Sequence, residues 1–189
     1  MDIRRPGPVI SVFGSSRITP DTPYYQQAHT LGALLAEAGF VVCNGGYDGA
    51  MGAVSRGARE RGGYTIGITM DLFRNRQPNA WLSEVRRTET LFRRLEELIL
   101  PADGYVVLHG GAGTLTELCL VWSLVLTRIL DVRPIILLGK PWHHVLDTLV
   151  TYLDVLPGDL DVLQVTATPE DAVAALKAAI WRRKEKENK

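Results

Sequence analysis

The chain has 189 residues, of which 21 are acidic and 21 are basic, so its formal net charge is zero. This length suits one core, and we expect a single domain over residues 1–189 with flexible ends at 1–7 and 182–189. The charge balance argues against nucleic acid or an anionic membrane as a partner, and no apolar run reaches the roughly 18 residues of a membrane-spanning helix.

Short runs of apolar and β-branched residues alternate along the chain with longer segments of helical spacing. We predict strands at residues 8–14, 39–45, 64–70, 104–110 and 133–139, with a sixth at 160–166. Between them, apolar spacing predicts helices over 23–39, 49–63, 89–102, 114–130, 141–156 and 168–183. Several strands are apolar at consecutive positions, which is typical of strands covered on both faces. The alternation predicts an α/β fold with a doubly wound parallel sheet.

Two segments depart from this regular pattern. Residues 72–87 contain a proline, asparagines and four arginines, which predicts a loop at the edge of the sheet where ligands bind in open α/β folds. The predicted helix from Leu115 to Leu130 is apolar on almost every face, and such a helix must be covered all round. One small sheet cannot cover it alone. We therefore expect a homodimer, or a higher oligomer, that packs through this helix.

The first strand ends in "FGSSR", where Gly14 and Ser15 offer backbone N–H groups and a hydroxyl to an anion, close to Arg17. An ordinary strand-to-helix turn explains these residues equally well. The second strand ends in "NGGYDGAMGAV", where Gly45 and Gly46 allow backbone conformations that are closed to other residues. The glycine spacing is not the dinucleotide fingerprint, and no phosphate-loop motif occurs. These absences argue against a nicotinamide dehydrogenase and a P-loop NTPase.

The fourth strand leads into "HGGAGTLTEL", where Gly110, Gly111 and Gly113 let backbone N–H groups approach a phosphate and Thr114 can add its hydroxyl. Thr114 and Glu117 also have the spacing of a capping box, in which each side chain bonds to a backbone donor of the other. By spacing alone the cap is the favoured interpretation. In the first helical turn, the helix dipole would favour the ionised form of Glu117.

The two cysteines, Cys43 and Cys119, lie inside apolar runs and have neither metal-ligand spacing nor that of a disulfide framework. A reducing cytoplasm is therefore the expected compartment. Nothing in the sequence requires a metal or another cofactor. A pyridoxal phosphate enzyme would need a lysine for its Schiff base, and only Lys140 lies near a strand end.

Together the three loops resemble the LONELY GUY (LOG) family of Rossmann-like proteins, long mislabelled as lysine decarboxylases. Its signature PGGxGTxxE is matched by "HGGAGTLTE" except at the first position, where His109 replaces proline. The family's GGGxxGLMG is represented by "GGYDGAMG", with Tyr47 for the third glycine, and its "FGSSR" is intact. The resemblance runs from about Val9 to Ile180. It implies a single Rossmann-like, nucleotide-binding domain with helices on both faces of the sheet.

The resemblance also implies an activity. Family members hydrolyse the N-glycosidic bond of nucleoside 5′-monophosphates, with AMP and cytokinin ribotides as substrates, and release the base and ribose 5-phosphate. The family element MxxRK corresponds to "LFRRL", which keeps Arg94 but has Leu91 and Leu95 at the flanking positions. An alignment on Arg93, one residue out of register, is the alternative. Without the family, both arginines would be interpreted as part of a solvated helix face or as ion-pair partners of Glu96 or Glu97.

By this resemblance, Glu117 and Arg94 are the catalytic residues. A carboxylate can stabilise the oxocarbenium-like transition state and orient water, and the arginine can hold the ribose or the glutamate. No residue stands out as the general acid; Asp48 and His109 are candidates by position, although we expect His109 to be a strand-end residue with a hydrogen-bonded imidazole. The expected substrate- and phosphate-binding residues are Gly14, Ser15, Arg17, Gly45, Gly46, Met51, Gly110, Gly111, Gly113 and Thr114.

The main alternative is a non-catalytic protein. Proteins of the same fold resemble carriers of the molybdenum cofactor, which need the phosphate cradle without the hydrolytic pair. The substitutions at Tyr47, His109 and Leu95 favour this alternative, whereas retention of Arg94 and Glu117 favours the enzyme. A DNA-processing type of Rossmann domain is disfavoured by the neutral charge and the lack of a basic stripe.

Overall fold

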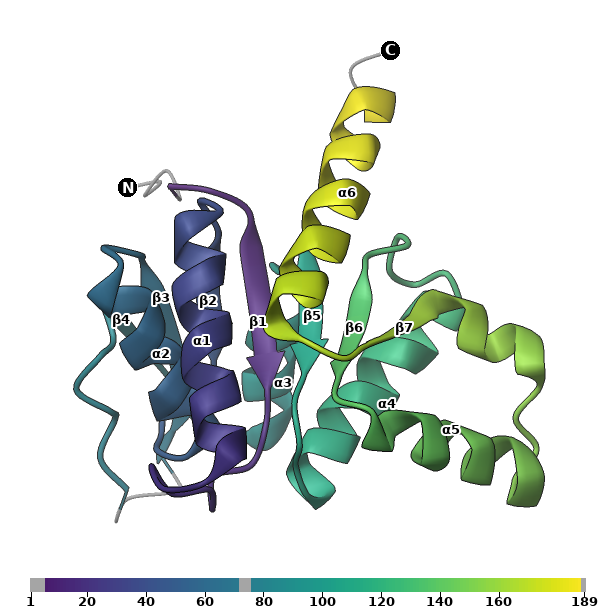
Figure 1. Ribbon diagram of the computed structural model, residues 1–189, viewed down its shortest axis with the longest axis horizontal. Helices are drawn as coiled ribbons and strands as arrows, with labels where there is room; N and C mark the ends of the chain where they lie inside the picture. Colours follow the sequence, from purple (N-terminus) through teal and green to yellow (C-terminus); the bar gives the residue numbers. More distant parts are fainter. Residues whose placement is uncertain (1–5, 72–75, 188–189) are drawn as a thin grey trace.

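The computed structural model describes residues 6–71 and 76–187, which form a parallel sheet between two layers of helices (Figure 1). The order of the strands is β4-β3-β2-β1-β5-β6-β7. Their bounds are Val9–Phe13 for β1, Val41–Asn44 for β2, Thr65–Met70 for β3, Glu84–Thr88 for β4, Gly104–Val107 for β5, Ile135–Leu138 for β6 and Leu163–Thr166 for β7. Since the order reverses between β1 and β5, the fold has a topological switch point there.

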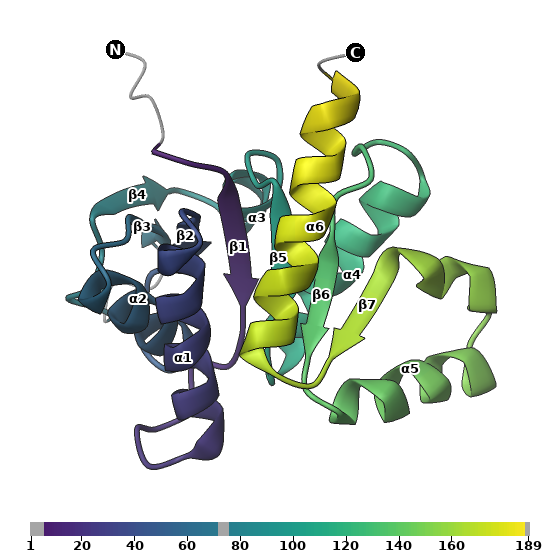
Figure 2. The ribbon, with the colours of Figure 1, turned by 45° about the horizontal axis from the view of Figure 1, so that its top comes forward.

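The two faces of the sheet have separate cores because successive side chains of a strand point to opposite faces. Ile10 and Val12 of β1 pack with α1 (Pro23–Glu37), α2 (Ala50–Glu60) and α6 (Pro169–Glu187). Val9 and Phe13 pack with α3 (Leu91–Ile99), α4 (Ala112–Leu126) and α5 (Pro141–Tyr152). A short 3-10 helix, η2 (Pro157–Val162), precedes β7, and α6 runs across β5 and β6 (Figure 2). The predicted doubly wound sheet is confirmed.

The expectation of a loop over residues 72–87 is partly wrong. Residues 72–75 lie outside the described residues, but residues 84–88 form β4, which pairs with β3 at the edge of the sheet. Its inward positions carry Glu84, Arg86 and Thr88, while the apolar Val85 is exposed. A strand with this inverted pattern has no apolar signature, because Glu84 and Arg86 occupy inward positions and form an ion pair with each other.

Two further features concern the ends of the chain and its helices. The expected flexible C-terminal residues continue α6 as far as Glu187, and residues 188 and 189 lie outside the described part. The helix predicted to reach Leu130 ends at Leu126. In the part of the chain that the structure describes, no helix has both the length and the apolar character to cross a membrane.

Candidate functional site

The three glycine-containing loops meet at the carboxyl edge of β1, β2 and β5, at the topological switch point. The backbone N–H of Ser15 donates to the carbonyl of His109 at 3.0 Å, and the N–H of Ala50 donates to the carbonyl of Ser15 at 2.8 Å. The chain after β1 is therefore hydrogen-bonded to the chains after β2 and β5. Between these loops lies a cavity of about 770 Å³, which we call the first cavity. This volume lies within the range of small-molecule sites.

Most of the residues expected to bind substrate line this first cavity. They are Gly14, Ser15, Arg17, Gly45, Met51, Arg94, Gly110, Gly111, Gly113, Thr114 and Glu117. Gly46 does not line it; its φ of +80° and the close approach of Thr69 and Gly67 give it a role in the turn. Asp48, a candidate general acid by position, is exposed and also absent from the lining.

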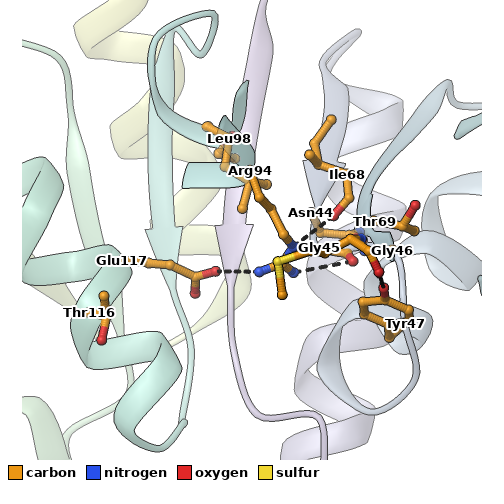
Figure 3. Close-up of polar contacts among 12 residues, drawn as sticks. Asn44, Gly45, Gly46, Tyr47, Ile68, Thr69, Arg94, Leu98, Thr116 and Glu117 are labelled. Atoms are coloured by element: carbon orange, nitrogen blue, oxygen red, sulfur yellow. Dashed lines mark hydrogen bonds and ion pairs between the residues drawn. The ribbon is translucent and has the colours of Figure 1, made fainter. Parts of the chain in front are cut away.

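Arg94 reaches the cavity from α3 and is held by backbone carbonyls of two other segments. Its Nε donates to the carbonyl of Ile68 at 2.9 Å, and its Nη2 donates to the carbonyl of Gly45 at 3.3 Å (Figure 3). The residue is only 8% exposed. Arg93, by contrast, is exposed and pairs with Glu96. The geometry therefore supports the alignment on Arg94 over the alternative on Arg93.

Gly45 is required by the position of this guanidinium group. A Cβ atom on Gly45 would lie 2.0 Å from Nη2 of Arg94 and 2.7 Å from Sδ of Met51. Both distances are well inside van der Waals contact, so any larger residue must displace one of these side chains. Glycine is thus present here for close approach, whereas at Gly46 it is present for its backbone conformation.

Glu117 reaches the cavity from α4 and points toward Arg94 (Figure 3), with 3.9 Å between Oε1 and Nη1. Burial raises the pKa of this carboxyl group to about 7, and the charge of Arg94 only partly opposes that rise. The expectation that the helix dipole favours the ionised form is wrong, because α4 begins at Ala112 and Glu117 lies beyond its first turn.

The capping-box interpretation of Thr114 and Glu117 is also wrong. The N-cap of α4 is Gly111, and no side chain caps this end. Thr114 lies inside the first turn, and its side chain packs against Gly110, where an added Cβ would lie 2.1 Å from Oγ1. A Cβ on Gly111 or Gly113 would meet nothing within 4 Å. The start of α4 therefore presents backbone N–H groups without intrahelical partners beside open space, which is the arrangement that binds anions.

Sequence reasoning missed part of the cavity wall and misjudged His109. The imidazole of His109 lines the cavity and stacks on Tyr24, with ring centroids 4.1 Å apart and planes inclined by 11°. Ser16, Ile18, Thr22, Tyr47 and Arg76 also line the first cavity. Arg76 belongs to the segment whose arginines signalled a loop at the functional edge. That composition was the only signal for it, since no motif contains it.

The substitution assigned to Tyr47 belongs to Asn44. The family's GGGxxGLMG has nine positions, and counting back from Gly52 places Asn44 at the first glycine and Tyr47 at a variable position. Asn44 is fully buried; its Oδ1 accepts the backbone N–H of Gly46, and its Nδ2 donates to Oγ of Ser55. This side chain holds the turn from within. The turn itself therefore survives the loss of the glycine.

The fold and the glycine-lined switch point define a Rossmann-like α/β protein. The chain belongs to the SLOG cluster4 family, which matches residues 7–150. A solved molybdenum cofactor binding protein from Rippkaea orientalis shares the fold, with a TM-score of 0.74 and 24% identity over 92% of this chain and 97% of its own.

Curated relatives confirm the resemblance to the LOG family. The cytokinin riboside 5′-monophosphate phosphoribohydrolase of Mycobacterium marinum is 35% identical over 62% of this chain and 63% of its own length, so the match spans less than two thirds of that protein. A protein of the same name from Mycobacterium tuberculosis is 32% identical over 78% of this chain and 82% of its own length.

Proposed function

We propose that the chain is a phosphoribohydrolase, a single nucleotide-binding domain that cleaves the N-glycosidic bond of a nucleoside 5′-monophosphate such as AMP or a cytokinin ribotide. One observation carries the proposal: a buried arginine and a largely buried carboxyl group face each other in the same cavity as an open helix start. The names of the curated relatives point to the same reaction. The products are the free base and ribose 5-phosphate.

The phosphate binds at the start of α4 in this proposal. The backbone N–H groups of Gly111 and Gly113 and the hydroxyl of Thr114 surround the open space there, and Ser15 and Arg17 line the same cavity. A dianion at a helix N-terminus is favoured both by the free N–H groups and by the helix dipole. Anchoring the remote phosphate lets the enzyme hold the ribose in one orientation.

The reaction takes place at the anomeric carbon, which lies beside Glu117 in the bound substrate. As the bond between this carbon and the base nitrogen breaks, the electron pair leaves with the base and the ribose gains positive charge. Ionised Glu117 stabilises that charge in a site of low dielectric constant. The same carboxylate orients the attacking water and takes its proton, for which a pKa of about 7 is well matched, and the nitrogen of the departing base gains a proton from solvent. Arg94 holds the carboxylate and the ribose hydroxyls in place.

We further propose that two copies associate through α4 and the turn that follows it. Leu115 and Leu126 of the helix are 43% and 39% exposed, and Ile129 and Val132 beyond it are 70% and 72% exposed. Covering these apolar side chains with the same face of a second copy removes them from water. Sedimentation of the protein as a monomer at micromolar concentration would contradict this. We also propose a cytoplasmic location, because Cys43 is buried, Cys119 is exposed and the two form no disulfide.

The test of the activity is to incubate the protein with AMP and to measure free adenine and ribose 5-phosphate by chromatography. We expect release by the unmodified protein and a loss of at least about 100-fold in Glu117→Gln. A thermal melt of the variant checks that the fold is retained. AMP binding without adenine release would contradict the hydrolase and support the nucleotide or molybdenum cofactor carrier. Unchanged turnover in Glu117→Gln would remove Glu117 from the mechanism.

A further inference from the structure

A second cavity lies farther along the same edge of the sheet, beside the ends of β5, β6 and β7. Its volume is about 510 Å³, within the range of small-molecule sites. Its walls come from the start of α1, the loop after β5, the first turn of α4 and the segment that joins β6 to α5. None of the residues proposed above for catalysis lines it. Only His109 and Gly110 line both cavities.

The walls of this second cavity are apolar and aromatic. Leu138 and Trp142 are buried, at 2% and 8% exposure, and form fixed parts of the lining. Leu115 and Val145, at 43% and 37% exposure, complete it toward the solvent. A flat apolar ring that enters such a cavity leaves water and gains contacts with the indole of Trp142.

Lys140, two residues after β6, supplies a positive charge to the lining of the second cavity. His109 also lines it. None of the lining residues is acidic. Within the described part of the chain Lys140 takes part in no ion pair. The cavity therefore offers an uncompensated ammonium group next to apolar walls, which is complementary to an anion attached to a ring.

The second cavity is separated from the reaction site by the start of α4. Leu115 and Glu117 are two residues apart on this helix, so their side chains leave it about 200° apart. Leu115 lines the second cavity and Glu117 lines the first. The loop of His109 and Gly110, with Tyr24 stacked on the imidazole, completes the partition. A ribose beside Glu117 therefore lies on the first-cavity side of this partition.

We propose that the second cavity binds a small aromatic carboxylate, with its ring against Trp142 and Leu138 and its carboxylate at Lys140. Binding itself does not depend on the proposed hydrolase. A consequence for activity does rest on that function: the carboxylate and the substrate phosphate lie on opposite sides of one short loop, and their like charges repel each other. The aromatic carboxylate therefore raises KM for AMP, and AMP weakens its binding by the same factor.

The experiment titrates the full-length protein with 2-naphthoate in a calorimeter and follows the Trp142 indole N–H by NMR. We expect one site per chain, with a shift of the Trp142 signal. Lys140→Met removes the charge but keeps the apolar stem, and it should weaken binding roughly tenfold. Val145→Trp fills the cavity and should abolish binding. Uncharged 2-naphthamide should bind the unmodified protein as weakly as 2-naphthoate binds Lys140→Met.

Matched control variants keep the outcome specific. Lys177→Met removes another exposed lysine, and Val85→Trp adds an indole at another exposed valine, so neither should change the affinity for 2-naphthoate. Thermal melts check the fold of each variant. The proposal would be overturned if 2-naphthoate did not bind the unmodified protein. It would also be overturned if Lys140→Met and Val145→Trp bound 2-naphthoate as tightly as the unmodified protein does. Loss of binding in Arg94→Ala with retention in Lys140→Met would place the ligand in the first cavity instead.

Two further outcomes separate this proposal from its alternatives. If 2-naphthoate fails to bind the unmodified protein, and Val145→Trp turns a dimer into a monomer in sedimentation, the cavity is an interface between copies and the proposal is overturned. If 2-naphthoate binds as expected but the protein releases no adenine from AMP, the hydrolase fails while the second site stands. If both hold, kinetics with 2-naphthoate should show a higher KM for AMP with unchanged kcat.

Discussion

The first and second cavities lie on the same edge of one sheet and share His109 and Gly110, but they differ in the charged groups that line them. The first contains a buried arginine and a largely buried carboxyl group. The second contains neither, and its one lysine sits beside apolar walls. A doubly wound sheet therefore supplies positions for ligands along its carboxyl edge, and the residues at each position decide what happens there.

The difference in how the charged groups are held is equally informative. Three segments fix Arg94, since α3 supplies it and carbonyls of Ile68 in β3 and of Gly45 just after β2 accept its hydrogen bonds. Lys140 follows β6 as the N-cap residue of α5 and forms no ion pair within the described residues. A charge that must act on a transition state needs such pre-organisation, whereas a charge that selects a ligand does not.

The largest effect is expected from removing the fixed charge of the first cavity. Arg94→Ala should lower kcat for AMP by about 1000-fold, because Glu117 loses its partner and the ribose loses a contact. Arg94→Lys should restore little of this loss, since one ammonium group cannot bond to Ile68 and Gly45 and face Glu117 in the geometry of a guanidinium fork. Adenine release at saturating AMP measures both.

A lysine variant with nearly normal kcat would show that only the charge matters at this position, and the contrast between a fixed and a loosely held cation would lose its basis. Circular dichroism melts of both variants test whether the fold is retained. The corresponding change in the second cavity, Lys140→Met, removes a cation whose proposed role is ligand selection alone.

A smaller effect is expected from moving the guanidinium group without removing it. Gly45→Ala places a Cβ atom 2.0 Å from Nη2 of Arg94, so the side chain must shift. A displacement of about 1 Å can cost on the order of 100-fold in rate, and we expect a loss of kcat between about tenfold and 100-fold. Gly158→Ala is the matched control, because its added Cβ meets nothing within 4 Å. Equal activity of the two variants would contradict the role of Gly45.

The pH dependence of kcat/KM tests the protonation state of Glu117. Burial raises the pKa of this carboxyl group to about 7, and the proposed mechanism uses the ionised form. Activity should therefore fall as the pH drops below about 7, by roughly tenfold per unit. The residual activity of Glu117→Gln supplies the control, because it retains any dependence that comes from the phosphate of AMP. A fall in activity as the pH rises through 7 would make Glu117 a proton donor instead.

Much of the fold could be predicted because buried parallel strands have a strong apolar signature. β1 and β6 are apolar at nearly every position, and each has helical segments around it. β4 could not be found in the same way. Its inward side chains are Glu84, Arg86 and Thr88, which are charged or polar, and only the pairing with β3 identifies the segment as a strand.

Within the first cavity, sequence motifs located the loops but could not determine the chemistry of their residues. Glycines and Thr114 are found by spacing, because turns and helix starts are local. The partner of Glu117 is 23 residues away on another helix, and the burial that raises its pKa comes from the whole fold. The helix dipole, which is a local argument, predicted the opposite shift.

The smallest expected effect concerns how one side chain in each cavity changes the pH dependence of the free energy of unfolding of the protein. The pKa of Glu117 is about 7 in the folded protein against 4.5 in a model carboxyl group, so the folded state keeps its proton longer. Between these values the folded state binds more protons than the unfolded state, and stability falls as the pH rises through that window. Glu117→Gln cannot ionise and escapes this loss. Between pH 4.5 and pH 8, the free energy of unfolding of the variant should rise by about 3 kcal/mol relative to that of the unmodified protein.

Urea denaturation at the two pH values measures this double difference, and Lys140→Met in the second cavity should behave like the unmodified protein. A gain confined to Glu117→Gln would show that the first cavity keeps a carboxylate at the expense of stability, which is expected of a group retained for its chemistry. If the free energies of unfolding of the unmodified protein and Glu117→Gln show the same pH dependence, burial of the carboxylate does not lower the stability of the folded state. The two cavities would then differ only in the ligands they bind.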